Sequence, residues 1–107
     1  MYYNKKGKKI TREEWAELFQ ADEDHRTVGR NYRTVEGHKY LISTVWLGLN
    51  HCYLGRGILI FETMIFQVDK NKKINFTDLY QERYSTEKEA IKGHEYTVKN
   101  IKKLINN

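Results

Sequence analysis

The sequence predicts an α+β domain in which an antiparallel sheet of four or five strands packs against two helices. Two long apolar runs, residues 39–50 and 58–68, flank a short polar loop, a pattern typical of neighbouring central strands. Capping-box residues precede an apolar helical stripe near each end of the chain. The 107 residues fit a single domain, 1–107, with the element order β-α-β-β-β-(β)-α.

Composition narrows the class of protein. The 19 basic and 14 acidic residues give a net charge of +5, which favours a polyanionic partner but also suits solubility alone. The single cysteine, Cys52, excludes an internal disulfide and suits a reducing compartment. No apolar run approaches the roughly 20 residues of a membrane span, and the first residues lack the apolar core of a secretory signal. We therefore expect a cytoplasmic protein with no membrane partner.

The N-terminal part predicts a hairpin followed by a helix. Residues 2–10 have the pattern of a short hairpin or edge strand that turns at Gly7. Thr11 and Glu14 then form a capping box. The helix of about ten residues that follows has one apolar face, formed by Trp15, Leu18 and Phe19. The polar residues 21–24 end it.

The middle of the chain predicts the sheet. Residues 25–34 alternate weakly, with Tyr32 on the same face as Arg30, and a turn at Glu36-Gly37 follows. The runs 39–50 and 58–68 are apolar on both faces, as expected of central strands that are covered on both sides.

The last third predicts a strand and a long helix. Residues 69–73 form a charged turn, residues 74–79 are ambiguous, and residues 80–84 read as a short final strand. A second capping box at 86–89 opens a helix whose apolar stripe continues through 90–105 to the C-terminus.

The expected packing leaves one sheet face uncovered if both helices lie on the other face. That uncovered face would expose large side chains such as Trp46, Tyr40 or Phe61. Monomers rarely leave so much apolar surface in water. We therefore expect a homodimer or higher oligomer that forms through the sheet.

Glu62 is the most informative single residue. It lies in the middle of a strand, with Ile60 and Met64 on its own face. A lone carboxylate is costly to bury there, so it either pairs with a cation or faces a ligand cavity. The sequence leaves both readings open. The candidate partners are Arg56, Arg83 and His94.

Two polar segments are candidates for binding an anion. In the loop 50–57, Arg56 could clamp an anion while the glycines let backbone amides approach it; the alternative is an ordinary hairpin loop. Arg83 and Tyr84 precede a helix N-terminus, where anions are favoured; the alternative is a surface strand end. His94 lies on a buried helical stripe, where a core histidine is the favoured reading.

The candidate ligand-binding residues all have polar side chains, and they lie near the ends or in the middle of the core strands or on the helix that follows them. They are Asn50, His51, Tyr53, Arg56, Glu62, Arg83, Tyr84 and His94. The sequence has no catalytic-triad order, phosphate loop or metal-ligand spacing, so we assign no catalytic residue, metal or cofactor.

Three segments carry a resemblance to a known family. Residues 43–51 (STVWLGLNH), 59–66 (LIFETMIF) and 83–95 (RYSTEKEAIKGHE) resemble a family of small uncharacterised proteins of bacteriophages and mobile elements. The resemblance implies a bacterial host cell but transfers no functional residue. The chain departs at 52–56, where similar sequences more often have a Gly- and Pro-rich loop, and this weakens a ligand role for Arg56.

Three hypotheses of function follow. The leading one is a non-enzymatic phage-type accessory protein that counters host defence by sequestering a nucleotide signal or by blocking a host defence protein. The first alternative is a nucleic-acid-binding module that uses Arg26, Arg30, Arg33 and Lys39 together with Tyr32 and Tyr40. The second is a small hydrolase centred on Glu62 and His51.

Overall fold

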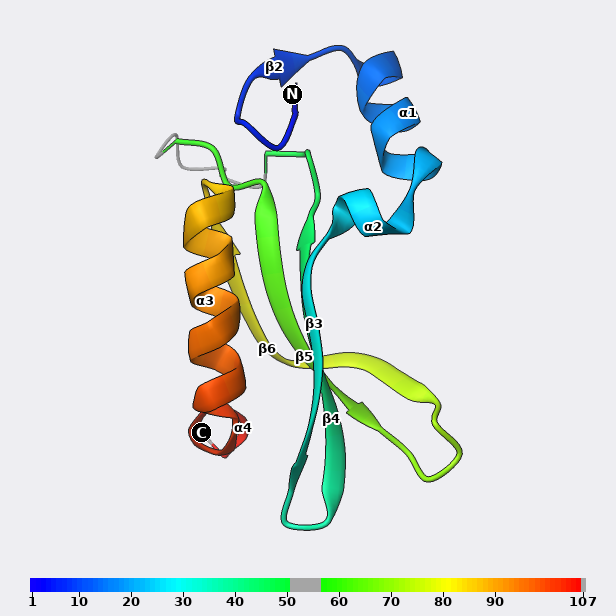
Figure 1. Cartoon of the computed structure of the whole chain (residues 1–107), viewed down its shortest axis with the longest axis vertical. Coiled ribbons are helices and arrows are strands. Elements are labelled where there is room, and N and C mark those ends of the chain that lie inside the picture. The colour runs from blue at the N-terminus through cyan, green and yellow to red at the C-terminus, as the bar shows by residue number, and fades with distance from the viewer. Residues whose placement is uncertain (51–56, 107) are drawn as a thin grey trace.

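The structure, a computed structural model, describes residues 1–50 and 57–106 (Figure 1). Within these ranges the chain forms a four-stranded antiparallel sheet, a two-stranded sheet and four helices. The predicted α+β fold is confirmed. The candidate residues His51, Tyr53 and Arg56 lie outside the described residues.

The predicted N-terminal hairpin is present as β1 (Tyr2–Tyr3) and β2 (Lys9–Ile10). Its turn is held by the Asn4 side chain, whose Oδ1 accepts hydrogen bonds from two backbone amides of the turn. Gly7 adopts a φ of 81°, in the left-handed region that glycine tolerates best. A bridge from Tyr2 to Leu49 joins the hairpin to the end of the main sheet.

The first predicted helix is α1 (Arg12–Ala21), and it begins at the predicted capping box. Thr11 Oγ1 accepts from the Glu14 amide, and the Glu14 carboxylate accepts from the Thr11 amide. The polar residues 21–24 end this helix, but they also start a second one, α2 (Glu23–Arg26). Asp22 is the N-cap of this second helix, because its Oδ1 accepts a hydrogen bond from the Asp24 amide at 2.9 Å.

The main sheet is a meander of four consecutive antiparallel strands. They are β3 (Thr27–Val35), β4 (His38–Trp46), β5 (Phe61–Val68) and β6 (Ile74–Tyr84). The predicted neighbours 39–50 and 58–68 do pair, as β4 and β5. They are shorter than predicted; past the end of β4, Gly48 adopts a φ of 72°. The weakly alternating residues 25–34 supply most of β3, and the ambiguous residues 74–79 belong to β6.

The C-terminal helix is broken, contrary to the prediction of one continuous helix. It forms α3 (Glu87–Lys99) and α4 (Ile101–Ile105), with Asn100 between them at φ −109° and ψ 21°. The Asn100 side chain donates to the Tyr96 carbonyl at 2.8 Å. An asparagine that bonds to the backbone in this way competes with regular helix geometry. The predicted capping box, Thr86 with Glu89, is confirmed at the start of α3.

The main core lies between the sheet and the two C-terminal helices. One cluster packs Tyr40, Ile42, Ile65 and Ile101 together, and a second packs Trp46, Ile60, Phe61 and Ala90. The prediction that Trp46, Tyr40 or Phe61 lies on an uncovered face is therefore wrong. Their exposed fractions are 0%, 9% and 0%, because α3 and α4 cover that face and because Phe19 and His25 also pack against the Trp46 ring.

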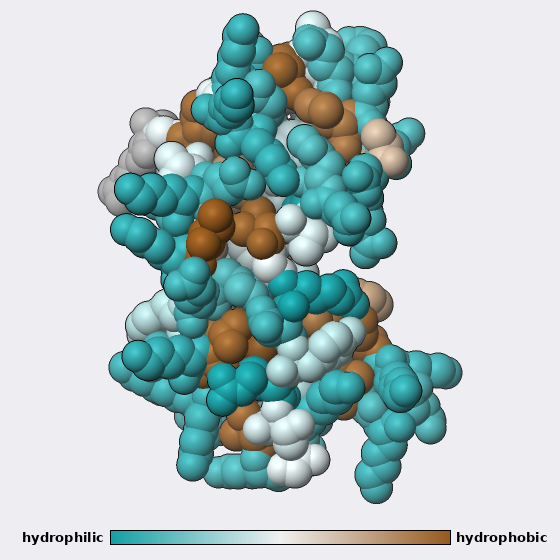
Figure 2. Space-filling view, viewed as in Figure 1, coloured by the Kyte–Doolittle hydropathy of each residue, from teal (hydrophilic) through white to brown (hydrophobic). Residues whose placement is uncertain are grey.

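The opposite face of the sheet, called the open face below, carries a smaller apolar cluster of Leu41, Phe66 and Val68. The helix α3 runs alongside the sheet, and α1 lies at its upper end (Figure 1), where Trp15, Leu18 and Phe19 pack against the second core cluster. Apolar side chains form several patches along the length of the molecule in this view, separated by hydrophilic ones, and hydrophilic side chains cover the β5–β6 hairpin at the lower right (Figure 2). No helix among the described residues is long and apolar enough to cross a membrane.

Candidate binding pocket

A pocket of about 350 Å³ lies between α1 and the upper end of the open face. Five of its lining side chains are apolar: Trp15, Phe19, Leu47, Leu49 and Met64. Three are polar: Glu62, Gln81 and Arg83. The pocket thus has one aromatic and aliphatic wall from α1 and the residues just after β4, and a second wall from β5 and β6, where the polar side chains lie beside Met64.

The aromatic wall is held in place by the backbone. The Trp15 indole donates to the Leu47 carbonyl at 2.9 Å, and its ring lies 5.0 Å from that of Phe19. Gly48 lets the indole approach, because a Cβ there would lie 2.4 Å from the Trp15 ring. Tyr2 supports the indole from the hairpin side, with its ring centroid 4.9 Å away. A bulky residue at Gly48 would displace this wall.

The second wall carries an ion pair between neighbouring strands. Glu62 pairs with Arg83 in the register of β5 and β6, and Gln81 lies two residues away on the same face. Arg83 Nε donates to Glu62 Oε2 at 2.9 Å, and Gln81 Nε2 donates to the same oxygen. Glu62 is only 6% exposed, so these two donors meet the need of a buried carboxylate for partners.

Both sequence readings of Glu62 therefore apply, since it forms an ion pair and also lines a pocket. Of the two candidate partners that the structure describes, Arg83 binds it and His94 does not. His94 lies on the other face of the sheet and contacts Thr44 and Asn31. Gln81 was not anticipated; the alternation of Gln81 and Arg83 in one strand was the signal that places them on one face.

The pocket has unused capacity for a polar ligand. Among the described residues, both donors to Glu62 use Oε2, so Oε1 can accept a hydrogen bond from a ligand. Arg83 uses Nε for this pair, and its side chain remains 33% exposed. A guanidinium has five N–H donors, and its remaining ones suit a carboxylate or a phosphate. The volume lies at the lower end of the range of roughly 300–1,000 Å³ seen for small-molecule sites.

The other described candidates lie elsewhere. Asn50 Oδ1 accepts from the Leu59 amide at 3.1 Å and so shapes the chain at the end of the sheet. Tyr84 lies under α3, where a Cβ at Gly93 would be 2.2 Å from its hydroxyl oxygen. Burial raises the pKa of Tyr84, so the phenol is neutral at physiological pH. Neither residue lines the pocket, and their role as ligand-binding residues stays a prediction.

His94 is a buried core histidine, as the sequence favoured. Its Nε2 lies 2.6 Å from Asn31 Oδ1, and its Nδ1 lies 2.7 Å from Thr44 Oγ1. Because an amide oxygen only accepts, Nε2 carries the proton and Nδ1 accepts from the threonine hydroxyl. Thr44 also contacts Thr63 Oγ1 at 2.5 Å. Burial lowers the pKa of His94 below its ordinary value of 6.5, and the charge of Glu95 opposes that shift.

The residues proposed for nucleic-acid binding separate into two groups. Arg30, Tyr32 and Lys39 gather on the open face, where the Lys39 ammonium lies 4.6 Å and the Arg30 guanidinium 5.8 Å from the Tyr32 ring centroid. These three residues remain available to a ligand.

The other three have structural contacts. The Arg26 guanidinium lies 4.9 Å from the ring centroid of Phe19 and donates to the carbonyl of the same residue. Arg33 points to the α3 side and donates to the Val98 carbonyl at 2.5 Å. Tyr40 is 9% exposed in the core. These contacts give the three residues structural roles, and their part in a nucleic-acid surface stays a prediction.

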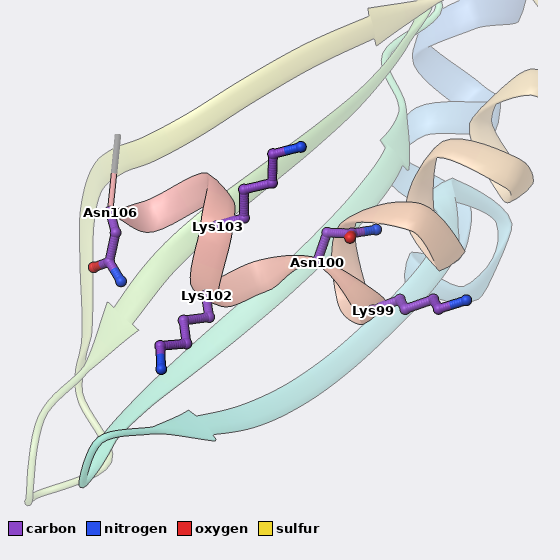
Figure 3. Close-up of a pocket in the computed structure, with 5 residues that line it drawn as sticks. All are labelled: Lys99, Asn100, Lys102, Lys103 and Asn106. Carbon is purple, nitrogen blue, oxygen red and sulfur yellow. The ribbon is translucent and has the colours of Figure 1, made fainter.

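A lysine-rich hollow of about 480 Å³ lies at the C-terminal end of the helices. Its lining residues are Lys99, Asn100, Lys102, Lys103 and Asn106. Figure 3 shows that the three lysines point in different directions, so they do not converge on one anion. Within residues 1–50 and 57–106, no group of three or more His, Cys, Asp or Glu residues could hold a metal ion.

The fold is that of a small α+β protein, and its pocket has an aromatic wall and a partly buried ion pair. Comparison with known proteins finds no matching family model, no similar curated protein and no similar solved structure.

Proposed function

We propose that the protein is a non-enzymatic binding protein that holds a nucleotide in the pocket between α1 and the open face. The observation that carries this proposal is the Glu62–Arg83 ion pair with Gln81 beside the Trp15–Phe19 wall. This arrangement combines a surface for a planar ring with an acceptor for its N–H groups and a donor for its phosphate.

Each part of a nucleotide has a counterpart in the pocket. A base has a π-face that packs on an aromatic side chain, and such stacking is worth about 1–3 kcal/mol per base. Glu62 Oε1 accepts from a ring or exocyclic N–H of the base. The free N–H groups of Arg83 bind a phosphate oxygen. The net charge of +5 attracts such an anion from solution.

The contacts favour binding over the hydrolase alternative. Among the described residues, the pocket lining contains no Ser, Thr, Cys or His that could serve as a nucleophile or as a second acid–base group beside Glu62. The hydrolase hypothesis pairs Glu62 with His51, which lies outside the described residues; the described His94 lies on the other face of the sheet and bonds to Thr44. Together with the resemblance to small phage proteins, binding without turnover supports a counter-defence role in which the protein sequesters a nucleotide signal. Blocking a host defence protein through the same pocket is the alternative use.

The test is calorimetric titration of the protein with linear mononucleotides and with cyclic mono- and dinucleotides. Trp15 supplies a second signal, because it lines the pocket, whereas Trp46 is 0% exposed in the core. We expect binding of at least one nucleotide with a change in Trp15 fluorescence. Failure of every nucleotide to bind at millimolar concentration would remove the proposal.

Variants locate the site. Arg83→Gln should weaken binding about tenfold, which corresponds to one charge-assisted contact of about 1.4 kcal/mol. Lys92→Gln removes the same unit of charge from an exposed position on α3 and is the matched control. Equal weakening in both variants would show that general charge, and not the pocket, attracts the nucleotide.

A further inference from the structure

The open face carries a row of aromatic and apolar side chains that crosses all four strands. Tyr32 on β3 pairs with Leu41 on β4, and Leu41 pairs with Phe66 on β5. At the far edge, Phe76 on β6 packs edge-on against Phe66 with ring centroids 5.6 Å apart. The two ends of the row are open to solvent, because Tyr32 is 46% and Phe76 is 74% exposed.

Two cations lie beside the β3 end of this row. Arg30 and Lys39 belong to the rows directly above and below Tyr32, opposite Ser43 and Thr34. Arg30 also donates to the Tyr32 hydroxyl at 3.1 Å. The ion pairs among the described residues involve the cations Lys5, Arg83 and Lys102. Arg30 and Lys39 therefore have no acidic partner within the described part of the chain.

We propose that this face binds an unpaired nucleic-acid strand, with Tyr32 and Phe76 as stacking surfaces and Arg30 and Lys39 as phosphate contacts. Aromatic side chains exposed on a sheet, combined with cations that follow the backbone, are the two elements by which proteins hold single strands without reading sequence. Tyr32 and Phe66 are two strand spacings apart, about 10 Å, and Phe76 lies beyond. The row is therefore long enough for more than one base.

The same contacts disfavour two other occupants. In a duplex the bases are stacked on one another, so their π-faces are not available to Tyr32 or Phe76. A second copy of the chain, docked face to face, would bring Arg30 and Lys39 near the same charges of its partner. Like charges at such an interface oppose association. The positive charge thus selects an anionic partner, and the aromatic row selects one with free bases.

This inference does not rest on the proposed nucleotide pocket, because the two surfaces share no residue. Glu62 and Arg83 lie at the upper end of the open face. The aromatic row crosses β5 at Phe66, which is two residues beyond the pocket residue Met64. Each surface can therefore be removed while the other is kept.

The experiment is fluorescence anisotropy of a labelled 15-nucleotide oligo-dT or oligo-U at 50 mM salt, titrated with the full chain. We expect Tyr32→Ala and Phe76→Ala each to weaken binding by between about 5-fold and about 150-fold, the range measured for a lost base–aromatic stack. Tyr96→Ala is the matched control, since Tyr96 is 49% exposed on α3. Phe76→Ala also guards against misfolding, because the removed ring is mostly in solvent.

The salt dependence tests the cations. A single strand loses affinity with a slope of about −0.7 in log K against log salt for each phosphate contact. Arg30→Gln with Lys39→Gln should therefore flatten the slope by about 1.4. Lys88→Gln with Lys92→Gln removes the same charge from exposed positions on α3 and should leave the slope nearly unchanged.

Three results would overturn the proposal. They are no binding of the oligonucleotide, equal affinity for a duplex of the same length, and binding that Tyr32→Ala and Phe76→Ala leave unchanged. Sedimentation that shows self-association lost in Tyr32→Ala would assign the face to a second copy instead. A strand that binds through Tyr32 while no mononucleotide perturbs Trp15 would support this inference and remove only the pocket proposal.

Discussion

The two faces of the main sheet both bury polar side chains, but they use them differently. On the face under α3, His94, Thr44, Thr63 and Asn31 bond to one another, and each nitrogen of the imidazole has a protein partner. On the open face, the Glu62 carboxylate shares one oxygen between two donors and lies beside a pocket. Burial of a polar group therefore does not mark a binding site by itself. What distinguishes the open face is that Glu62 and Arg83 keep an acceptor oxygen and N–H donors that no described residue uses.

The two faces also differ in how they offset the free-energy cost of burying a titratable side chain. Under α3 the imidazole is kept neutral, because burial lowers its pKa and both of its nitrogens have hydrogen-bond partners. On the open face a carboxylate is balanced by a guanidinium that is one-third exposed. A neutral, closed network rigidifies a core, whereas a pair near solvent can exchange partners with a ligand.

The largest expected effect on the free energy of unfolding comes from truncating two neighbouring side chains of β5 that point to opposite faces of the sheet. Ile65 is 0% exposed under α3, while Met64 points to the open face and is partly exposed. Ile65→Ala should lower the free energy of unfolding by about 2–5 kcal/mol, the cost of deleting a large aliphatic side chain from a packed core. Met64→Ala should cost clearly less, about 1–2 kcal/mol, because part of its surface is already in water. Urea unfolding monitored by circular dichroism measures both.

This pair of variants can contradict the description of the two faces. An equal loss of stability at the two positions would mean that the open face is covered in solution as fully as the α3 face. Repeating the unfolding at several protein concentrations separates the cases, since a covering second copy would make the midpoint rise with concentration. That dependence would support the oligomer predicted from the sequence.

A smaller effect should appear as pH dependence from the α3 face. The pKa of His94 is lower in the folded chain than in the unfolded chain, where it is close to 6.5. Below that pH the unfolded chain takes up a proton that the folded chain refuses, so stability falls as the pH is lowered through 6.5 and levels off below the folded pKa. Above pH 6.5 both states are neutral at this site and the contribution vanishes.

The measurement is urea unfolding of the native chain and of His94→Gln between pH 5 and pH 8. Gln keeps an amide that can bond to Thr44 or Asn31 but does not titrate. The difference in stability between the two proteins should shrink as the pH falls, because only the histidine chain loses stability there. A difference that stays constant across this range would show that His94 titrates alike in both states.

The sequence predicted the parts of the molecule that depend on local chemistry. Both capping boxes are four-residue patterns, and both were confirmed. The pairing of β4 with β5 follows from two adjacent apolar runs, and Glu62 was singled out because a charge interrupts one of them. His94 was placed in the core by its position on a helical stripe.

The parts that depend on long-range packing were not predictable. The faces of Trp46, Tyr40 and Phe61 depend on which side α3 docks, and the strand pattern is apolar on both sides. Arg26 and Arg33 read as free cations in the sequence, but tertiary contacts with Phe19 and Val98 occupy them. The aromatic wall of the pocket required α1 to pack at the end of the sheet, a choice that no local pattern encodes.

The smallest expected effect distinguishes the two capped helices. Thr86→Ala and Thr11→Ala remove the same kind of N-cap hydrogen bond, at 3.1 Å in each case. At α3 the loss should lower the global free energy of unfolding by about 1 kcal/mol, since this helix buries Ala90, His94 and Thr97 against the sheet. At α1 no residue is buried, so the loss should fall mainly on local opening of that helix.

Hydrogen exchange separates these two outcomes. In Thr11→Ala the α1 amides should exchange about fivefold faster, the factor that corresponds to about 1 kcal/mol, while the β4 and β5 amides keep their native protection. In Thr86→Ala protection should instead fall across the whole sheet. Uniform loss of protection in Thr11→Ala would mean that α1 unfolds only with the core. The pocket wall formed by Trp15 and Phe19 would then be as stable as the core, whereas faster exchange confined to α1 would show that this wall opens independently of it.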